Sequence, residues 1–157
     1  MRTRISWNST RPGKKCIISL GLVFPCRHFI LQNNSEIQEL PEGVFEVLSF
    51  QNIYLSNTAL KAIHPLAILS SRGQLENLTV ENSRLGRFPF HVLSMLPRLK
   101  GLWLKNNSFT SVPAIQSENL EILYLSNNAI QRIKEYGWTT PNLKVIDLGE
   151  YAPFGTV

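Results

Sequence analysis

The sequence has few of the residues on which most enzyme and metal sites depend. It contains two cysteines, three histidines and a single aspartate, Asp147, among 157 residues. His28, His64 and His91 fall at unrelated positions, and the sequence has no H-x-x-x-H, C-x-x-C or G-x-S-x-G motif and no glycine-rich phosphate loop. Catalysis needs such groups placed together. We therefore expect a protein that is not an enzyme, with no catalytic residue, no metal site and no cofactor.

An excess of charge is also missing once the first fifteen residues are set aside. Of the sixteen bases behind the net charge of +5, five lie in residues 1–15, where there is no acid, and the other eleven match the eleven acids. The five are Arg2, Arg4, Arg11, Lys14 and Lys15. A body without excess positive charge is not attracted to phosphate, so we expect no nucleic-acid partner. Residues 1–15 are predicted to be a basic, disordered leader.

Long apolar stretches are absent, apart from one run. The segment CIISLGLVFPC, from Cys16 to Cys26, is too short to cross a bilayer core of about 30 Å, and nothing later in the chain could span a membrane. Three interpretations of residues 16–25 stay open: a degenerate secretory signal or anchor, an N-terminal cap strand, or a non-native start from an incomplete gene model. Two states of Cys26 also stay open, a buried thiol and a disulfide with Cys16.

The dominant feature of the sequence is one apolar pattern that recurs six times. In LKGLWLKNNSFTSVP, residues 99–113, the leucines, Asn107, Phe109 and Val112 follow L-x-x-L-x-L-x-x-N-x-L. Equivalent phrases, repeats one to six, begin at residues 26, 50, 75, 99, 120 and 143. The pattern predicts an α/β leucine-rich repeat solenoid of about five and a half repeats over residues 26–148. We expect a concave parallel β-sheet and an irregular or short helical convex side.

A polar residue follows each predicted strand and is expected to bind the backbone of the turn. Stacked repeats would place these residues in a ladder, which we call the asparagine ladder. Its members are Asn34, Thr58, Ser83, Asn107 and Asn128. A hydroxyl offers fewer hydrogen bonds than an amide, so the ladder is predicted to be weaker at Thr58 and Ser83.

The segments between strands and the end of the chain carry their own expectations. Apolar residues recur at helical spacing in residues 41–50 and 89–99, which indicates helical returns on the convex side. Residues 149–157 continue no repeat and are interpreted as a truncated tail. The last strand is then an exposed edge, through which terminal repeats could associate.

Alternation along each strand predicts a binding surface. The residue between the two inward positions must point to the concave face, and these residues are Ile30, Tyr54, Thr79, Trp103, Tyr124 and Asp147. Exposed tyrosine and tryptophan dominate binding energies, so we predict a protein-binding patch centred on Trp103. Its members are Tyr54, Thr79, Trp103, Lys105, Tyr124 and Ser126. The alternative is that aromatic residues merely suit half-buried strand positions.

Four N-x-[ST] sequences are candidate glycosylation sites and would fit a secreted protein. They begin at Asn8, Asn33, Asn77 and Asn106. A glycan on Asn77 would crowd the predicted binding face.

The repeats resemble those of extracellular leucine-rich repeat proteins, which often carry P-x-x-x-F after the turn, as in LPEGVF at residues 40–45. FQNIYLSNTALKAI, LENLTVENSRLGRFPFHVL and IQSENLEILYLSNNAIQRI are similar to phrases of arthropod secreted repeat proteins labelled as similar to the non-catalytic subunit of Oplophorus-luciferin 2-monooxygenase. In that family the light-producing chemistry belongs to another, small subunit. The resemblance implies a secreted binding or stabilising partner without luciferase activity, although the cysteine-rich flanking caps of many relatives are missing.

Two classes of function remain open at the level of sequence. One is an extracellular, non-enzymatic scaffold that recognises a protein partner on the concave sheet. The other is an intracellular repeat adaptor, or a structural repeat fragment without its own ligand.

Overall fold

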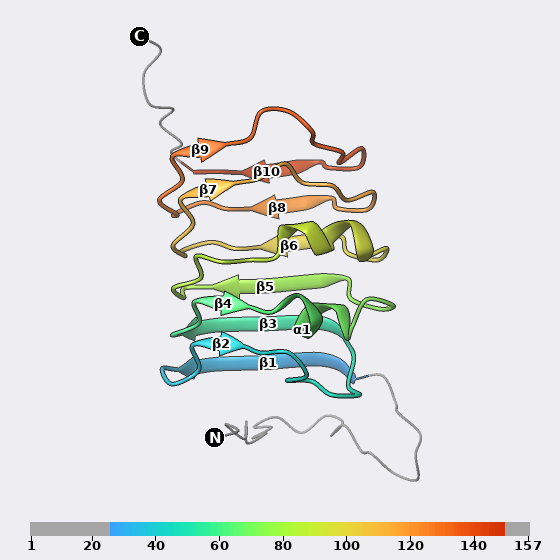
Figure 1. The fold of residues 1–157 in the computed structure, drawn as a ribbon, viewed down its shortest axis with the longest axis vertical. Helices are drawn as coiled ribbons and strands as arrows, with labels where there is room; N and C mark the ends of the chain where they lie inside the picture. The colour runs from blue at the N-terminus through green and yellow to red at the C-terminus, as the bar shows by residue number, and fades with distance from the viewer. Residues whose placement is uncertain (1–25, 150–157) are drawn as a thin grey trace.

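The computed structural model describes residues 26–149, which form a parallel β-solenoid (Figure 1). The predictions for residues 1–15 and 16–25, for the end of the tail, for Asn8 and for a Cys16–Cys26 bridge concern residues outside this range. One strand from each repeat joins a six-stranded parallel sheet in the order β1-β3-β5-β6-β8-β10. These strands are β1 (Cys26–Asn34), β3 (Phe50–Thr58), β5 (Asn77–Glu81), β6 (Gly101–Trp103), β8 (Ile122–Tyr124) and β10 (Val145–Asp147).

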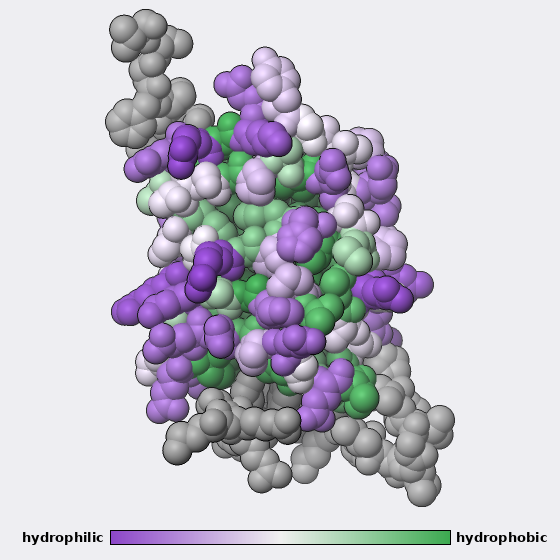
Figure 2. Space-filling model, viewed as in Figure 1, coloured by the Kyte–Doolittle hydropathy of each residue, from purple (hydrophilic) through white to green (hydrophobic). Residues whose placement is uncertain are grey.

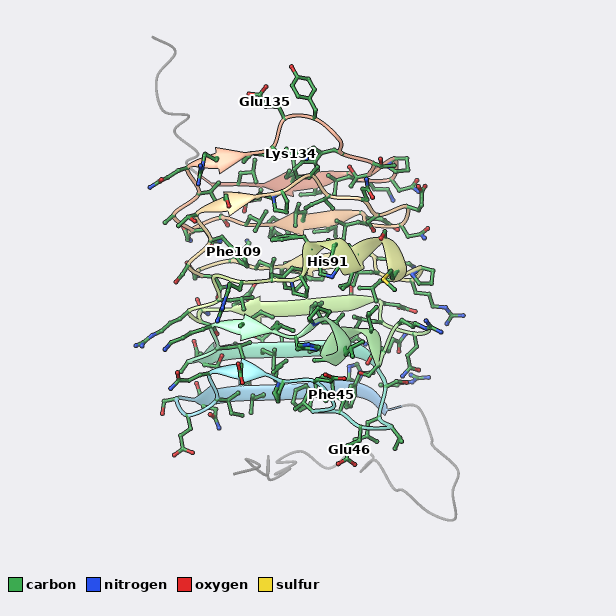
Figure 3. The ribbon with its side chains drawn as sticks, in the orientation of Figure 1. Phe45, Glu46, His91, Phe109, Lys134 and Glu135 are labelled. Atoms are coloured by element: carbon green, nitrogen blue, oxygen red, sulfur yellow. The ribbon has the colours of Figure 1, made fainter. Side chains whose placement is uncertain are left out.

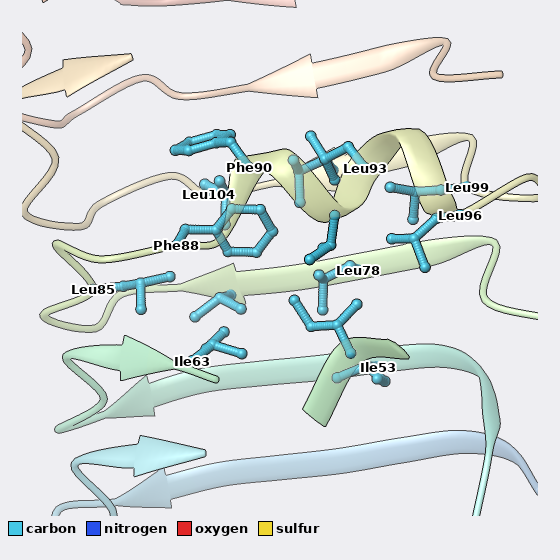
Figure 4. Packing of buried hydrophobic residues seen from close by; sticks show 14 of the residues in the cluster. Ile53, Ile63, Leu78, Leu85, Phe88, Phe90, Leu93, Leu96, Leu99 and Leu104 are labelled. Atoms are coloured by element: carbon cyan, nitrogen blue, oxygen red, sulfur yellow. The ribbon is translucent and has the colours of Figure 1, made fainter. Parts of the chain in front are cut away.

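The register of the sheet superposes the repeats as the apolar spacing predicts. Ile53 pairs with Leu78, Leu78 with Leu102, and Leu102 with Leu123. Successive side chains of a strand point to opposite faces, so each strand turns alternate apolar residues into one continuous core (Figure 4). Leu102 and Leu123 are both 0% exposed. A single repeat could not achieve this, because its leucines are covered by the repeats on either side.

Three phenylalanine rings close the core at its N-terminal end. Phe29 and Phe50 each lie against Phe45, with ring centroids 5.0 Å apart in both pairs and the rings nearly perpendicular. Phe45 comes from the turn segment that follows β2 (Glu39–Leu40). This edge-to-face packing covers the first repeat with aromatic surface, as repeats further along are covered by their neighbours.

The side opposite the sheet, which we call the back side, carries the short elements in the front of Figure 1. Two small parallel pairs lie here, β2 with β4 (Ala62–Ile63) and β7 (Ser111–Val112) with β9 (Arg132–Ile133). The α-helix α1 (Pro65–Leu69) and the 3₁₀ helix η1 (Phe90–Met95) lie on the same side. Among the residues that the structure describes, no helix is long and apolar enough to cross a membrane.

The helical returns predicted from apolar spacing are right in one segment and wrong in the other. Residues 89–99 contain η1, but within residues 41–50 there is no helix and residues 42–47 form turns, because Gly43 and Glu46 adopt positive φ angles of 70° and 49° that an α-helix cannot contain. The helix α1 was not predicted from the apolar spacing. It begins where Pro65 supplies a helical φ and the Nδ1 atom of His64 accepts a hydrogen bond from the Leu66 N–H, so His64 is a helix cap.

The asparagine ladder joins repeats in the second half of the solenoid. The Asn107 amide donates to the carbonyls of Val80 and Leu104, while its oxygen accepts from the Leu85 N–H at 3.1 Å, so it binds both its own repeat and the preceding one. Asn128 makes the equivalent bonds to Leu104, Leu125 and Phe109. These bonds satisfy backbone groups that the turn would otherwise leave unpaired.

The ladder is different in the first three repeats. The Asn34 oxygen accepts from Glu36 and Ile37, both within its own loop. At Thr58 and Ser83 hydroxyls replace the amides: the two hydroxyls bond at 2.8 Å, and the Ser83 hydroxyl accepts from the Thr58 N–H at 3.3 Å, which joins repeats two and three. The geometry therefore agrees with fewer ladder bonds at the hydroxyl positions.

A second column of asparagines precedes the ladder, and the sequence analysis missed it. Each residue has a positive φ: Asn33 (55°), Asn57 (53°), Asn82 (50°), Asn106 (51°) and Asn127 (57°). Asparagine tolerates this left-handed conformation better than other residues with a side chain. Two side-chain bonds join members of the column, Asn57 to Asn33 at 3.1 Å and Asn106 to Asn82 at 2.7 Å. The signal was an asparagine immediately before the ladder residue in five repeats.

Candidate binding face

The sheet face that points away from the core, here called the open sheet face, carries the predicted column in the predicted order. Its members, paired across neighbouring strands, are Ile30, Tyr54, Thr79, Trp103, Tyr124 and Asp147. All except the exposed Ile30 are half-buried. Trp103 and Tyr124 are direct neighbours, because β6 and β8 pair at these residues. The two aromatic side chains therefore lie side by side on the same face of the sheet.

Gly101 lets the Trp103 side chain lie against the sheet. A Cβ atom built on Gly101 would clash with Cη2 and Cζ3 of the indole, so the outer edge of the ring occupies the space that a side chain at this position would need. In the other repeats, the residues at the position of Gly101 all carry a side chain; they are His28, Asn52, Asn77, Ile122 and Val145. The repeat that has glycine at this position is therefore the repeat that has tryptophan two residues later. Sequence reasoning missed Gly101, although its position two residues before Trp103 was available as a signal.

A polar network joins the last three strands beside Trp103. The Lys105 ammonium lies 4.0 Å from the centroid of the Tyr124 ring and 3.7 Å from the Asp147 carboxylate. The Ser126 hydroxyl, the Gly149 N–H and Lys105 hold the pKa of Asp147 below its usual range, with the hydrogen bond from Ser126 contributing most. Cation–π contact and hydrogen bonding therefore fix the orientation of the residues next to the indole.

Asn52 and Asn77 lie on the same face beside Gly101. The Asn77 amide donates to the Asn52 oxygen at 2.7 Å, and the Asn77 oxygen lies 3.1 Å from the Cβ position built on Gly101. Asn77 is half-buried in this arrangement, whereas the glycosylation candidates Asn33, near the end of β1, and Asn106, in a bend after β6, are exposed. The three candidates within the described residues therefore occupy two different environments.

The described residues contain no group of three histidine, cysteine, aspartate or glutamate side chains that could hold a metal ion. His64 caps α1, and His91 lies exposed on η1 (Figure 3). His28 lies on β1, at the other end of the solenoid from Asp147. The structure brings none of these residues together.

Together, the repeat register, the parallel sheet and the asparagine ladder define a leucine-rich repeat solenoid. Such solenoids present an extended surface with side chains from several repeats, which suits recognition.

Comparison with known proteins confirms the resemblance that the repeat phrases indicate. The chain is a distant homologue of the Oplophorus-luciferin 2-monooxygenase non-catalytic subunit of Oplophorus gracilirostris, with 32% identity over 120 residues, which are 75% of this chain and 33% of that protein. It is also 32% identical over 113 residues to Receptor-like protein 9b of Arabidopsis thaliana, across 69% of this chain and 11% of that protein. The chain thus spans a third or less of either relative. No family model and no solved structure matches it.

Proposed function

We propose that this chain is a non-enzymatic, extracellular scaffold that binds a protein partner through its open sheet face. The contact residues are Tyr54, Thr79, Trp103, Lys105, Tyr124 and Ser126. The observation that carries the proposal is that the Trp103 indole occupies the space a side chain at Gly101 would need, with Tyr124 on the next strand. Aromatic side chains held on a rigid sheet lose little conformational freedom on binding and commonly dominate interface energies.

The surroundings of Trp103 support a protein interface. The Lys105 ammonium lies over the Tyr124 ring, the buried Ser126 hydrogen-bonds Asp147 next to it, and half-buried Thr79 pairs with Trp103 on the opposite side. An apolar centre with polar groups around it is the usual anatomy of such interfaces. The name of the Oplophorus relative, a non-catalytic subunit, agrees with a role in assembly rather than chemistry.

The proposed extracellular location predicts N-glycans on the exposed Asn33 and Asn106, while a glycan at Asn77 would obstruct the binding face. Protein produced in a secretory host should lose mass on treatment with a glycosidase, and peptide mapping should place the sugar on Asn33 and Asn106. An unchanged mass would contradict glycosylation, and full occupancy of Asn77 would contradict the binding face.

The experiment that tests the binding face is Trp103→Ala combined with Tyr124→Ala, examined by pull-down from the native secretion or tissue extract. Tyr136→Ala is a matched control, because Tyr136 is an aromatic residue that is 80% exposed and lies outside this face. We expect the double variant to keep the circular dichroism of the parent and to lose the partner that the parent and the control retain. Retention of every partner by the folded double variant would overturn the proposal.

Gly101→Ala provides an independent test of the same face. The added methyl group must displace the Trp103 ring, so this variant should weaken binding without removing an aromatic residue. In a Trp103→Ala background the same change should have no further effect on binding. An equal loss of binding in both backgrounds would show that Gly101 acts on the backbone and not through the indole.

A further inference from the structure

A hollow of about 710 Å³ lies on the back side, where repeats three, four and five meet. Its apolar lining includes Phe88, Phe90, Phe109, Val112 and Ile133. Figure 2 shows an apolar area on this side of the molecule between groups of hydrophilic side chains, and Figure 3 locates Phe109 within it. We call this hollow the back-side groove.

The groove lies between the two short pairs of strands on the back side. On the back side β2 pairs with β4, and Ala62 of β4 bridges to Arg87; pairing is next found between β7 and β9. Between these two ladders, the rings of Phe88, Phe90 and Phe109 pack edge to face in sequence, with centroids 4.9 Å and 5.7 Å apart. Together with the backbone bond from the Ser108 N–H to the Leu85 carbonyl, these rings join repeats three and four, and they give the groove an apolar floor.

The rim of the groove carries positive charge that no acid balances. Arg87, Arg132 and Lys134 line it and are exposed, and its lining includes no aspartate or glutamate. The two ion pairs found among the described residues, Lys105–Asp147 and Lys144–Glu121, involve none of these three cations. Three cations that face one hollow, with no acid in its lining, raise the local potential and favour an anionic ligand.

A second hollow of about 440 Å³ provides an internal comparison. Its lining contains Arg98, Lys100 and Lys144, but also Glu76 and Glu121, and Lys144 lies 2.7 Å from Glu121. Two acids thus offset two of the three positive charges of this hollow. The back-side groove combines an apolar floor with an unbalanced rim, and the second hollow does not.

We propose that the back-side groove binds an acidic segment of a partner protein, with an apolar side chain placed between carboxylates. The apolar side chain would cover the floor, and the carboxylates would reach Arg87, Arg132 and Lys134. Clusters of basic residues recognise acidic peptide motifs in this way, while the apolar contact provides an anchor. The proposal concerns the side of the solenoid opposite the sheet face and does not depend on it.

Fluorescence anisotropy with synthetic peptides tests this proposal on the purified chain. The probe peptide places one phenylalanine between pairs of glutamates; one comparison peptide replaces the phenylalanine with alanine, and another replaces the glutamates with lysines. Arg87→Ala, Arg132→Ala and Lys134→Ala are combined in one variant. Its control combines Arg72→Ala, Arg98→Ala and Lys100→Ala, which remove the same charge from exposed positions outside the groove.

The expected result is that the probe peptide binds the parent and the control with affinities within about twofold, and binds the groove variant at least about tenfold more weakly. Ser111→Tyr would fill the groove from an exposed position without changing its charge, and should weaken binding to a similar degree. The lysine peptide should not bind. Replacing phenylalanine with alanine should also weaken binding by about tenfold, since the floor would be left uncovered.

Other outcomes would overturn the proposal. Equal binding of the phenylalanine and alanine peptides, or an equal loss in the groove variant and its control, would show a general attraction of anions. Displacement of the probe by single-stranded DNA or heparin at comparable concentrations would have the same meaning. Absence of binding by the probe peptide to the folded parent would exclude an acidic segment of this kind.

Discussion

The inner repeats and the last repeat carry apolar residues at equivalent positions that differ in their exposure to solvent. Leu102, Leu123 and Ile146 occupy one register position on neighbouring strands. The first two are 0% exposed, whereas Ile146 is 46% exposed, because β10 lies at the edge of the described sheet and no described repeat covers it. The comparison shows that burial in a solenoid is a property of the neighbouring repeats rather than of the residue.

The last strand relies instead on polar contacts with the repeats before it. The Leu125 N–H donates to the Asp147 carbonyl of this strand at 2.6 Å, and the Val145 N–H of this strand donates to the Glu121 carbonyl at 3.1 Å. The Lys144–Glu121 and Lys105–Asp147 side-chain pairs add to these. The inner repeats thus depend on apolar burial, and the last repeat depends more on hydrogen bonds and charge.

Leu102→Ala should have the largest effect on the free energy of unfolding. We expect a loss of about 2–5 kcal/mol, because the substitution leaves a cavity in a continuous core. Ile146→Ala is the matched change at the same register position and should cost less than about 1 kcal/mol, since Ile146 is already half exposed to solvent. Urea denaturation measures both variants. Equal losses would show that the edge position is covered in solution.

Asn107→Ala should have the next largest effect, about 1–3 kcal/mol, because it leaves backbone groups of two repeats without partners. Asn34→Ala is the control, since the bonds made by the Asn34 side chain stay within its own loop. It should cost less than Asn107→Ala in the same denaturation experiment. An unchanged melting temperature for Asn107→Ala would refute the stabilising role of the ladder.

Acid should loosen the last strand before it loosens the inner strands. The Lys144 hydrogen bond lowers the pKa of Glu121, and the Ser126 hydrogen bond lowers the pKa of Asp147. A lowered folded-state pKa means that each carboxylate stabilises the fold above its unfolded pKa and loses this contribution as the pH falls through its folded pKa. Below the ordinary values of 4.5 and 3.8, the β10 amides should lose more hydrogen-exchange protection than those of β6.

The variant Glu121→Gln with Asp147→Asn is the control for this acid effect. Its β10 amides should be less protected at neutral pH, and their protection should change less between neutral and acid pH. If the parent and this variant lost protection in parallel as the pH fell, the two carboxylates would not be the cause.

Ser117→Ala should have the smallest effect, with the opposite sign. Ser117 is 3% exposed, and its hydroxyl makes no hydrogen bond among the described residues. Removing this buried oxygen should raise the free energy of unfolding by up to about 1 kcal/mol. Thermal unfolding of the parent and the variant measures the difference, and a clear loss of stability would reveal a partner for the hydroxyl in solution.

Much of the candidate binding face could be predicted from strand alternation and repeat spacing. Trp103 and Tyr124 could be placed side by side because strand alternation and repeat spacing require no knowledge of packing. The glycine beneath the indole could not be assigned in this way, since the ring could point along the strand in several directions. The helix predicted for residues 41–50 is wrong because apolar spacing does not reveal the positive φ angles of Gly43 and Glu46.

The sequence alone determined the repeat register, the inward residues of each strand and the order of the column on the open face. These follow from short-range periodicity, which each repeat carries in its own residues. Only the tertiary structure decided that Ile146 is exposed where Leu123 is buried, and that Arg87 shares a groove with Arg132 and Lys134. Such features arise where side chains of different repeats meet, and their burial and potential depend on distances that no single repeat encodes.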